Sequence, residues 1–306
     1  MDWSTEIRAA AERIKGHVVK TPVMNSSAFG LPYSVELKFE QMQHTGSFKP
    51  RGAFNTLISE GAPKAGIVAA SGGNHGAAAA YAAKTLGYHA RIYVPEVAGA
   101  SKIALIKSMG ADLQVVKGQY SEALLGAQDW ERDTGARQVH AYDTIPTVAG
   151  QGTLALEWEA QGLEADTVLI AVGGGGLIAG AAAWFQGTKK IVAVEPETSC
   201  ALNAALKSGA PIDVEVSGIA VNALGAKKIG QICFDLAVQT GMQSVLVSDA
   251  AIQKAQNLLW RTHRQLVEPA GATALAALIG GAYKPEEDEK VAVLVCGANI
   301  APDPSP

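Results

Sequence analysis

Cysteine is scarce in this sequence. The chain has 306 residues and three cysteines, Cys200, Cys233 and Cys296, which stand far apart and without CxxC spacing. A disulfide framework or a structural zinc site needs cysteines in pairs or close clusters, so neither is expected, and we predict no metal site. Isolated thiols are typical of the reducing cytoplasm, where we expect the protein to act.

The sequence also lacks blocks of like charge and an uninterrupted apolar segment of membrane-spanning length. Its net charge is −4, so we do not expect a nucleic-acid partner. The first six residues have none of the apolar character of a signal peptide. The one long uncharged run, 168–186, has four glycines at its centre and therefore indicates strand, loop and helix. We expect no membrane partner.

The residues that are abundant indicate a compact α/β protein. Apolar residues make up 48% of the chain and charged residues 18%. Segments with strand patterns alternate with segments with helix patterns, which implies mainly parallel sheets with right-handed crossovers. The expected strands cover 35–40, 66–70, 91–95, 113–116, 167–172, 190–195, 244–247 and 291–295. The expected helices cover 3–15, 49–59, 77–86, 101–109, 120–132, 154–159, 201–206, 231–239 and 250–263, with one more directly after 173–177.

Lys49 has an unusual sequence setting. It directly precedes Pro50 and follows Ser47 by two residues. Proline suits the first position of a helix, where its missing N–H is not needed, and Ser47 is placed to cap that helix. The partial positive charge at a helix start helps to lower the pKa of Lys49, which favours a neutral, nucleophilic amine. An ordinary surface lysine after a turn is the alternative.

Four consecutive glycines, 173–176, separate an expected strand from an expected helix. Their backbone N–H groups, together with those of the helix start, can converge on a phosphate. Two other interpretations stay open. One is a tight packing turn; the other is a dinucleotide-binding site, because residues 174–179 fit the GxGxxA pattern and Glu195 ends the next strand.

Two more segments carry polar groups at the ends of expected strands. The loop 71–76 reads Ser-Gly-Gly-Asn-His-Gly and opens a helix, whose free N–H groups and nearby serine hydroxyl suit a carboxylate. An Asx-type cap at Asn74 is the alternative. The last strand runs into Cys296, which places a thiol at the sheet edge where ligands sit in open α/β proteins, although a buried cysteine is often inert.

In combination these segments resemble one family, the pyridoxal-phosphate enzymes of the tryptophan-synthase-β type, in particular threonine and serine dehydratases. The resemblance extends from the first helix to Asn299. Its motifs are Gly-Ser-Phe-Lys-Pro-Arg-Gly-Ala (46–53), Ser-Gly-Gly-Asn-His-Gly (71–76), Gly-Gly-Gly-Gly-Leu (173–177) and Val-Glu-Pro-Ala-Gly-Ala (267–272). It implies fold type II, with two open, twisted α/β domains and the cofactor in the cleft between them. The small domain would cover 66–142, and the large domain 1–65 and 143–306.

The same resemblance implies roles for single residues. Lys49 would hold pyridoxal 5'-phosphate as a Schiff base and later remove the α-proton of the substrate, with Phe48 beside the ring. Asn74 would hydrogen-bond the phenolic oxygen of the cofactor, and Cys296 would face the pyridine nitrogen. The remaining site residues belong to two loops: the phosphate would be held by Gly173, Gly174, Gly175, Gly176 and Leu177, and the substrate carboxylate by Ser71, Gly72, Gly73, Asn74 and His75.

The implied reaction is a β-elimination in which a small β-hydroxy amino acid, such as L-threonine or L-serine, yields a 2-oxo acid and ammonia. A thiol facing the pyridine nitrogen, unlike a carboxylate, would leave that nitrogen largely unprotonated, which favours loss of a β-hydroxyl over transamination. Related serine racemases have a serine where this chain has Gly72, so we expect weak or no racemisation.

Several alternatives stay open. β-Hydroxyaspartate is another possible substrate, with Arg51 or His44 as the cation for its second carboxylate. A β-replacement synthase of the same fold would add a nucleophile after elimination, and a non-catalytic binder would keep the cofactor without turnover. A nicotinamide-dependent oxidoreductase built on residues 174–195 is the alternative from another class. We expect a homodimer that binds a small amino-acid substrate.

Overall fold

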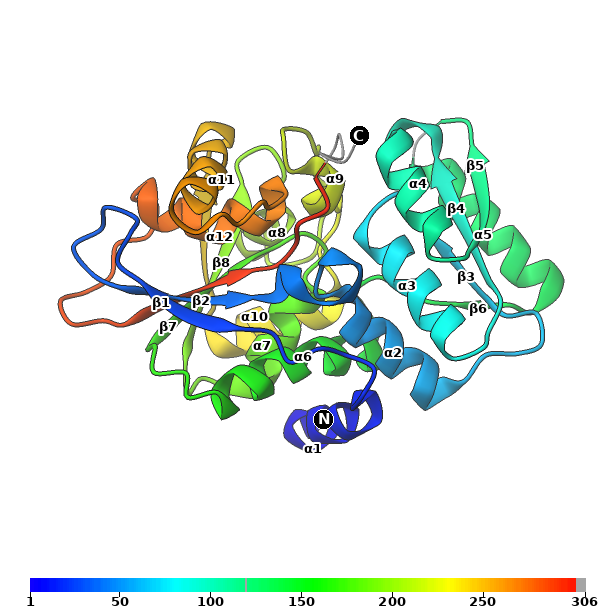
Figure 1. Cartoon of the computed structure of the whole chain (residues 1–306), viewed down its shortest axis with the longest axis horizontal. Helices are drawn as coiled ribbons and strands as arrows, with labels where there is room; N and C mark the ends of the chain where they lie inside the picture. The colour runs from blue at the N-terminus through cyan, green and yellow to red at the C-terminus, as the bar shows by residue number, and fades with distance from the viewer. Residues whose placement is uncertain (119, 301–306) are drawn as a thin grey trace.

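The chain folds around two separate sheets (Figure 1). A computed structural model describes residues 1–118 and 120–300. The six-stranded sheet on the left of Figure 1 has the order β1-β2-β10-β7-β8-β9, and the four-stranded sheet on the right has the order β5-β4-β3-β6. Neighbouring strands are parallel except β1 and β2. The predicted α/β fold with mainly parallel sheets is therefore confirmed.

The larger sheet has helices on both faces, with α11 and α12 above it in Figure 1 and α6, α7 and α10 below it. Its strands are β1 (Val23–Ser26), β2 (Val35–Phe39), β7 (Thr167–Ala171), β8 (Lys190–Pro196), β9 (Gln243–Val247) and β10 (Val291–Val295). The helices outside the smaller sheet are α1 (Trp3–Ile14), α2 (Lys49–Glu60), α6 (Ile145–Ala160), α7 (Gly176–Phe185), α8 (Ala201–Ser208), α9 (Val221–Leu224), α10 (Gln231–Thr240), α11 (Asp249–His263) and α12 (Pro269–Ile279). Strand β1 and helices α9 and α12 were not predicted from the sequence.

The smaller sheet and its helices form one continuous segment of the chain. They are β3 (Ile67–Ala70), α3 (Asn74–Thr85), β4 (Ala90–Pro95), α4 (Ala100–Ser108), β5 (Asp112–Val116), α5 (Tyr120–Thr134) and β6 (Arg137–Gln138). All of them lie inside the range 66–142 that we predicted as the small domain, although the domain boundaries themselves stay a prediction. Residues 301–306 of the predicted large domain lie outside the described residues. Within the described part of the chain, no helix is long and apolar enough to cross a membrane.

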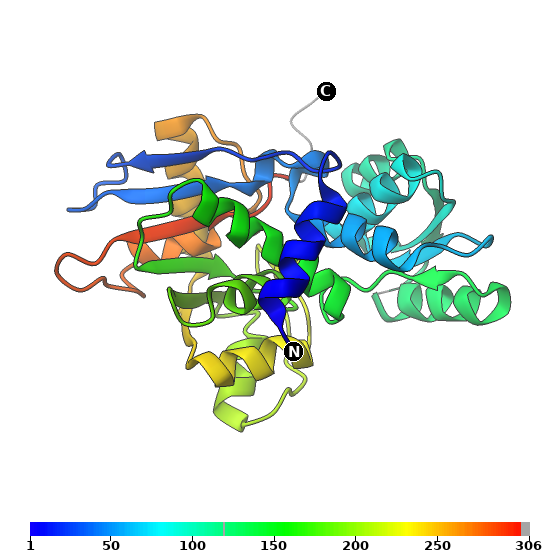
Figure 2. The same cartoon turned by 90° about the horizontal axis from the view of Figure 1, so that it is seen from below.

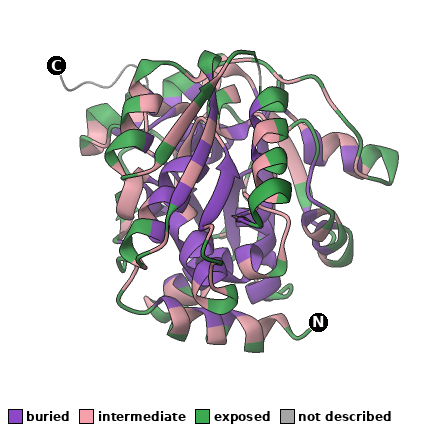
Figure 3. Ribbon diagram, turned by 90° about the vertical axis from the view of Figure 1, so that its right-hand side faces the viewer, coloured by how far each residue is buried: buried purple, intermediate pink, exposed green. Residues whose placement is uncertain are grey.

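The sheet interiors form the core, as the purple strands of Figure 3 show. Strands β2, β7 and β10 are buried at every position. In β2 the buried positions include the charged residues Glu36 and Lys38, and the following Glu40 is buried as well. Glu36 accepts a hydrogen bond from the indole N–H of Trp158 on α6, at 2.6 Å.

Lys38 and Glu40 belong to a buried network of charges. Arg51 on α2 donates to both carboxylate oxygens of Glu40, at 2.6 and 3.1 Å, and to Glu157 on α6 at 2.9 Å. Lys38 donates to the other oxygen of Glu157 at 2.5 Å and to Thr21 O at 2.9 Å. Because Arg51 is 1% exposed and fully engaged in this network, its interpretation as a cation for a second substrate carboxylate is wrong.

Helices α2, α6 and α7 pack with their backbones in contact. Helix α6 begins at Ile145, so the segment 148–153, which we expected to precede a helix, lies within one. A Cβ atom on Gly150 would lie 2.6 Å from Arg51 O, and one on Gly152 would lie 3.0 Å from Gly180 O on α7. These glycines are therefore packing positions inside a helix. Figure 2 shows α1 crossing the underside of the molecule, where it packs on α6 and α2.

Three of the sequence motifs leave neighbouring strands at one edge of the larger sheet. Strand β2 leads into the Lys49 segment, β10 ends at Cys296, and β7 leads into the glycine loop 173–176. Because β2, β10 and β7 are parallel and adjacent, their carboxyl ends meet at the same edge. The loop 71–76 follows β3 in the smaller sheet, and its Asn74 reaches this edge by a hydrogen bond to Asn299.

Candidate active site

Lys49 is the first residue of α2, with Pro50 in the first turn as predicted. The predicted cap is wrong: Phe48 occupies the N-cap position, and Ser47 is extended and pairs with Gly297, with no partner for its hydroxyl among the described residues. The amine Nζ of Lys49 donates to Ala141 O at 2.8 Å and lies 5.1 Å from the centre of the Phe48 ring. Burial lowers the pKa of Lys49 to about 8, because the charged form loses its hydration.

The glycine loop turns sharply from β7 into α7. Gly175 is the N-cap of α7 and has a φ of 95°, in the region that favours glycine, so no side chain caps the first N–H groups of the helix. A Cβ atom at Gly174 would overlap the ring of Tyr142, and one at Gly175 would lie 2.5 Å from Cys233 Sγ. The loop is therefore tightly packed and also presents free backbone donors. Leu177 is buried in the core, so only its backbone is available to a ligand.

Glu195, which the dinucleotide interpretation needs for a ribose, serves another purpose. Its two carboxylate oxygens accept the backbone N–H groups of Leu202 and Asn203 at the start of α8, both at 2.8 Å. Burial raises its pKa to about 7. Because this carboxylate is fully buried and caps a helix, it is not free to bind a ribose.

The loop 71–76 presents its backbone at the start of α3. Ser71 Oγ accepts the N–H of Gly73 at 3.2 Å, and Gly72 lies against Ala98, whose Cβ would overlap any Cβ at position 72. His75 is buried, and its Nε2 donates to Val139 O at 2.8 Å. Burial lowers the pKa of His75 to about 3, so the ring is neutral and its side chain holds the loop in place. The group of His75 that could bind a carboxylate is therefore its backbone N–H.

Asn74 connects the smaller sheet to the Lys49 edge. Its Nδ2 donates to Glu268 Oε1 at 2.5 Å, and its Oδ1 accepts from Asn299 Nδ2 at 2.8 Å. Asn299 in turn donates to Thr45 O at 2.7 Å, four residues before Lys49. The structure thus brings Asn74 next to the Lys49 segment. The sequence analysis gave no role to Glu268 or Asn299, although both lie in or beside motifs that it quoted.

Cys296 lies beside Lys49 at the end of β10. Phe48 N donates to Cys296 O at 3.3 Å, and the thiol donates to Ala270 O at 3.4 Å. Burial raises the pKa of Cys296 above its usual range, so the group at this place is a neutral thiol. The group at this place is therefore a weak hydrogen-bond donor, and not a carboxyl group that could protonate a pyridine nitrogen.

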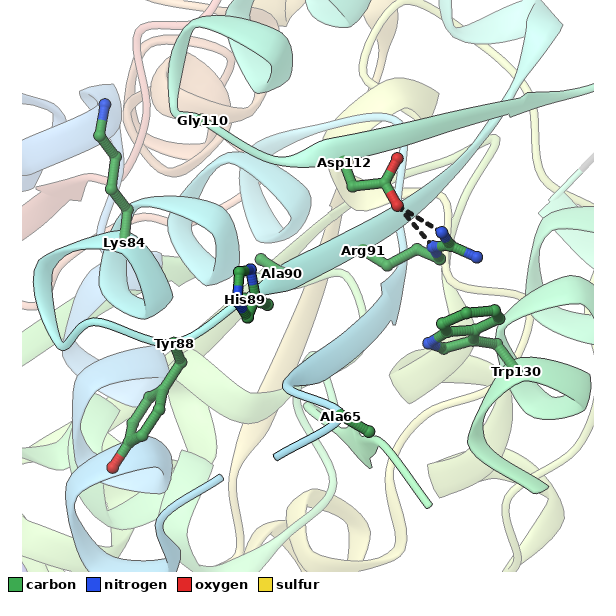
Figure 4. A pocket seen from close by; sticks show the side chains of 9 residues that line it. All are labelled: Ala65, Lys84, Tyr88, His89, Ala90, Arg91, Gly110, Asp112 and Trp130. Atoms are coloured by element: carbon green, nitrogen blue, oxygen red, sulfur yellow. Dashed lines mark hydrogen bonds and ion pairs between the residues drawn. The ribbon is translucent and has the colours of Figure 1, made fainter. Parts of the chain in front are cut away.

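A hollow away from the Lys49 edge does not resemble a second active site. A hollow of about 460 Å³ lies at the amino ends of the smaller sheet's strands (Figure 4). There Arg91 forms an ion pair with Asp112 at 2.6 Å and stacks at 3.5 Å on Trp130, so its charge is already matched. Across residues 1–118 and 120–300, no group of three or more metal-ligating side chains occurs.

The residues at the Lys49 edge fit pyridoxal 5'-phosphate. A buried amine with a lowered pKa could form a covalent bond to an aldehyde, free N–H groups at the start of α7 suit a phosphate, and a neutral thiol suits a pyridine nitrogen. The packing of the glycine loop leaves no room for side chains that would compete with the phosphate.

Comparison with known proteins agrees with this fit. Residues 14–297 match the family model described as pyridoxal-phosphate dependent enzyme. The chain is 33% identical to phenylserine dehydratase of Ralstonia pickettii, over 94% of this chain and 90% of that protein. It is also 33% identical to L-threonine ammonia-lyase of Thermotoga maritima, over 96% and 75%. Maize serine racemase superposes with a TM-score of 0.90 at 30% identity, covering 97% of this chain and 93% of that one. The chain therefore belongs to the pyridoxal-phosphate dependent enzymes of fold type II, in the group that is similar to threonine and serine dehydratases.

Proposed function

We propose that the protein dehydrates and deaminates a small β-hydroxy amino acid, such as L-threonine or L-serine, to a 2-oxo acid and ammonia. The observation that carries this proposal is the pairing of a buried lysine amine, of pKa about 8, with a neutral thiol on the adjacent strand. When bound, pyridoxal phosphate acts as a sink for the electrons that the α-carbon of the substrate releases. The thiol of Cys296 keeps that sink weaker than a carboxylate would, which favours loss of the β-hydroxyl.

Each residue of the site has a separate role in this reaction. Lys49 would hold the cofactor between turnovers and, once displaced by substrate, would accept the α-proton on Nζ, because its lowered pKa of about 8 gives the neutral amine a far larger fraction near physiological pH than an ordinary lysine has. The backbone of 71–75 and the hydroxyl of Ser71 bind the substrate carboxylate at the start of α3. The loop 173–177 holds the phosphate, and Asn74 donates to the phenolic oxygen. The β-hydroxyl takes a proton and departs as water, and the released enamine hydrolyses to 2-oxo acid and ammonia.

Gly72 supports dehydration over racemisation. A racemase needs a second proton donor on the face of the substrate opposite Lys49, and the resemblance locates that donor at the position of Gly72. Glycine has no hydroxyl, and Ala98 fills the space that a side chain there would need. Serine racemases are among the similar proteins, and Gly72 is the position that argues for a lyase rather than a racemase.

Three further expectations, on the domains, the oligomeric state and the cellular location, complete the proposal. The cofactor lies in a cleft between a small domain, 66–142, and a large domain formed by 1–65 and 143–306. The protein is a homodimer. It acts in the cytoplasm, which agrees with free thiols at all three cysteines.

A panel assay tests the proposal. Purified protein with pyridoxal phosphate is supplied with L-serine, L-threonine, phenylserine and both β-hydroxyaspartate diastereomers, and 2-oxo acid and ammonia are measured. We expect turnover of at least one small hydroxy amino acid. Added sulfide identifies a synthase, because a replacement reaction would divert the product away from 2-oxo acid.

The variant Lys49→Ala should lose turnover and the visible absorbance of bound cofactor. Lys64→Ala, which changes an exposed lysine, is the matched control and should keep both. Undiminished activity in Lys49→Ala would reject the assignment. Bound cofactor without turnover of any panel member would indicate a binding protein.

A further inference from the structure

We infer that Glu268 and Asn299 are positioning residues that fix the orientation of the Asn74 amide, and that Lys102 on α4 supplies the charge that keeps Glu268 an acceptor. The inference rests on the proposed function, in which Asn74 donates to the phenolic oxygen of the cofactor. Neither the pattern of the sequence nor the similarity to other proteins assigned these three residues a role.

The orientation of Asn74 follows from a chain of hydrogen bonds that starts at a backbone carbonyl. Thr45 O can only accept, so the group of Asn299 that faces it is Nδ2, at 2.7 Å. The second hydrogen of this Nδ2 points to Asn74 at 2.8 Å, which requires an acceptor there, Oδ1. Asn74 Nδ2 must then face Glu268, to which it donates at 2.5 Å. One N–H of Asn74 remains free to donate to a ligand.

Asn299 is held in place by the residues before Lys49. Thr45 and Gly46 both have a positive φ, of 60° and 74°, and a Cβ atom on Gly46 would lie 2.6 Å from Asn299 Oδ1. Ala298 N donates to Gly46 O at 2.9 Å. The turn that leads into Lys49 and the segment that presents Asn299 are therefore one packed unit.

Glu268 is held from the opposite side. It is the N-cap residue of α12 and is 3% exposed, and its backbone N–H donates to Gly297 O at 3.3 Å. A Cβ atom on Gly297 would overlap Glu268 Oε1, so the carboxylate lies directly against the backbone that follows Cys296. Burial raises the pKa of Glu268 to about 7, so its charge depends on its neighbours near neutral pH.

Lys102 is the cation that favours the charged form of Glu268. It comes from the smaller sheet's helix α4, is 5% exposed, and its Nζ lies 4.0 Å from the place that a Cβ atom on Gly73 would take. The electrostatic interaction between the two groups lowers the pKa of Glu268 and raises that of Lys102, against the effect of burial on each. The other ionisable group that interacts with Glu268 is Cys296, which is neutral.

The charge of Glu268 decides how strongly Glu268 reinforces the Asn74 orientation that Asn299 selects. A carboxylate only accepts, so it selects the orientation with Nδ2 toward it. A protonated carboxyl group also donates, so it would tolerate Oδ1 and weaken the selection. The hydrogen bond from Asn74 to the phenolic oxygen, and with it the electronic state of the bound cofactor, should then depend on Glu268.

The test uses the absorption spectrum and the affinity of the cofactor in the holoenzyme. Glu268→Gln keeps the shape but offers a donor as well as an acceptor, and Glu287→Gln, on an exposed residue, is the matched control. We expect Glu268→Gln and Asn299→Ala to alter the visible spectrum and to weaken cofactor binding about tenfold, the effect of one hydrogen bond to a charged group. The control should change neither.

Two further variants separate positioning from other roles. In the Asn74→Ala background, Glu268→Gln should change the spectrum no further, because its effect passes through Asn74. In Lys102→Met, any spectral transition near neutral pH should move to higher pH, since the cation that lowers the pKa of Glu268 is gone.

Wild-type spectra and affinity in both Glu268→Gln and Asn299→Ala would overturn the inference, as would an equal effect of Glu268→Gln with and without Asn74. If Glu268→Gln does not fold, Asn299→Ala alone decides, because it leaves no buried charge unpaired. Failure of the proposed function would look different: no 2-oxo acid from any hydroxy amino acid, with the spectral effects of the variants intact.

Discussion

Arg51→Met tests the buried charge network that begins two residues after Lys49. The side chain of Arg51 is 1% exposed, and it makes the two short contacts of the Glu40 carboxylate. Without it, the Glu40 carboxylate would keep a long hydrogen bond from Gln43 Nε2, at 3.5 Å, among the described residues. Glu157 would still have Lys38 at 2.5 Å, so the unpaired charge would be that of Glu40.

The expected cost follows from this geometry. Removing one partner of a buried ion pair destabilises a protein by about 3–5 kcal/mol, because the remaining charge is left without water or counter-charge. The entropy of unfolding scales with length, so about 1.6 °C of Tm is lost per kcal/mol in a chain of this size, and we expect Tm to fall by about 5–8 °C. Thermal unfolding followed by circular dichroism measures it.

A second substitution identifies the cause. Glu40→Gln should destabilise the wild-type protein but restore part of the stability of Arg51→Met, because it removes the unpaired charge. Arg132→Met is the control, since Arg132 also contacts two carboxylates but is exposed, and it should leave Tm nearly unchanged. If Tm falls in Arg51→Met and falls further when Glu40→Gln is added, the explanation is refuted and lost packing is indicated instead.

Three more outcomes are expected. Gly174→Ala forces the ring of Tyr142 away, at an overpacking cost of about 1–3 kcal/mol. The affinity for the cofactor, measured by fluorescence titration, should therefore fall about tenfold, and adding Tyr142→Ala should restore part of this affinity. Gly72→Ser should lower dehydratase activity by displacing Ala98, and the pair Gly72→Ser with Ala98→Gly should recover it and gain detectable racemisation by chiral chromatography. Since the pKa of Lys49 is about 8, the rate at which apoprotein combines with pyridoxal phosphate should rise about tenfold per pH unit below that value and level off above it; a flat profile would contradict the role of burial.

The sequence predicted the parts of the fold that local patterns determine. The strands that end at Cys296 and at the glycine loop are short apolar runs followed by residues that break a strand, and both were predicted to within a residue. The order of these strands in the sheet has no local signal. The meeting of the motifs at one edge was therefore predicted only through the family resemblance. Helix α6 was predicted to start too late because Gly150 and Gly152 suggest a loop, whereas they are needed for contact between helices.

The candidate site was predictable where a motif carries the chemistry, and not where the partner lies far along the chain. Asn74 was singled out from its own loop, but Glu268 and Asn299 lie 194 and 225 residues away, and nothing local links them. The burial of Glu36 and Lys38 on strand β2 was missed for the same reason. Their partners Trp158 and Glu157 lie on helix α6, 122 and 119 residues away. Ser47 was misassigned as a cap because the helix begins at Lys49, which puts Phe48 at the N-cap position and leaves Ser47 one residue before it, paired with Gly297.

The glycine contacts among α2, α6 and α7 have a consequence for selectivity. Helix α2 starts at Lys49 and α7 starts at the glycine loop, and each lies directly on the backbone of α6. The span between the backbone of Lys49 and the glycine loop is consequently set by main-chain contacts, so only the Lys49 side chain can adjust the distance from its amine to the loop. An aldehyde whose phosphate arm is longer or shorter than that of pyridoxal phosphate would have to be accommodated by the rotamers of this one side chain, because the helices that carry the two ends are packed against α6.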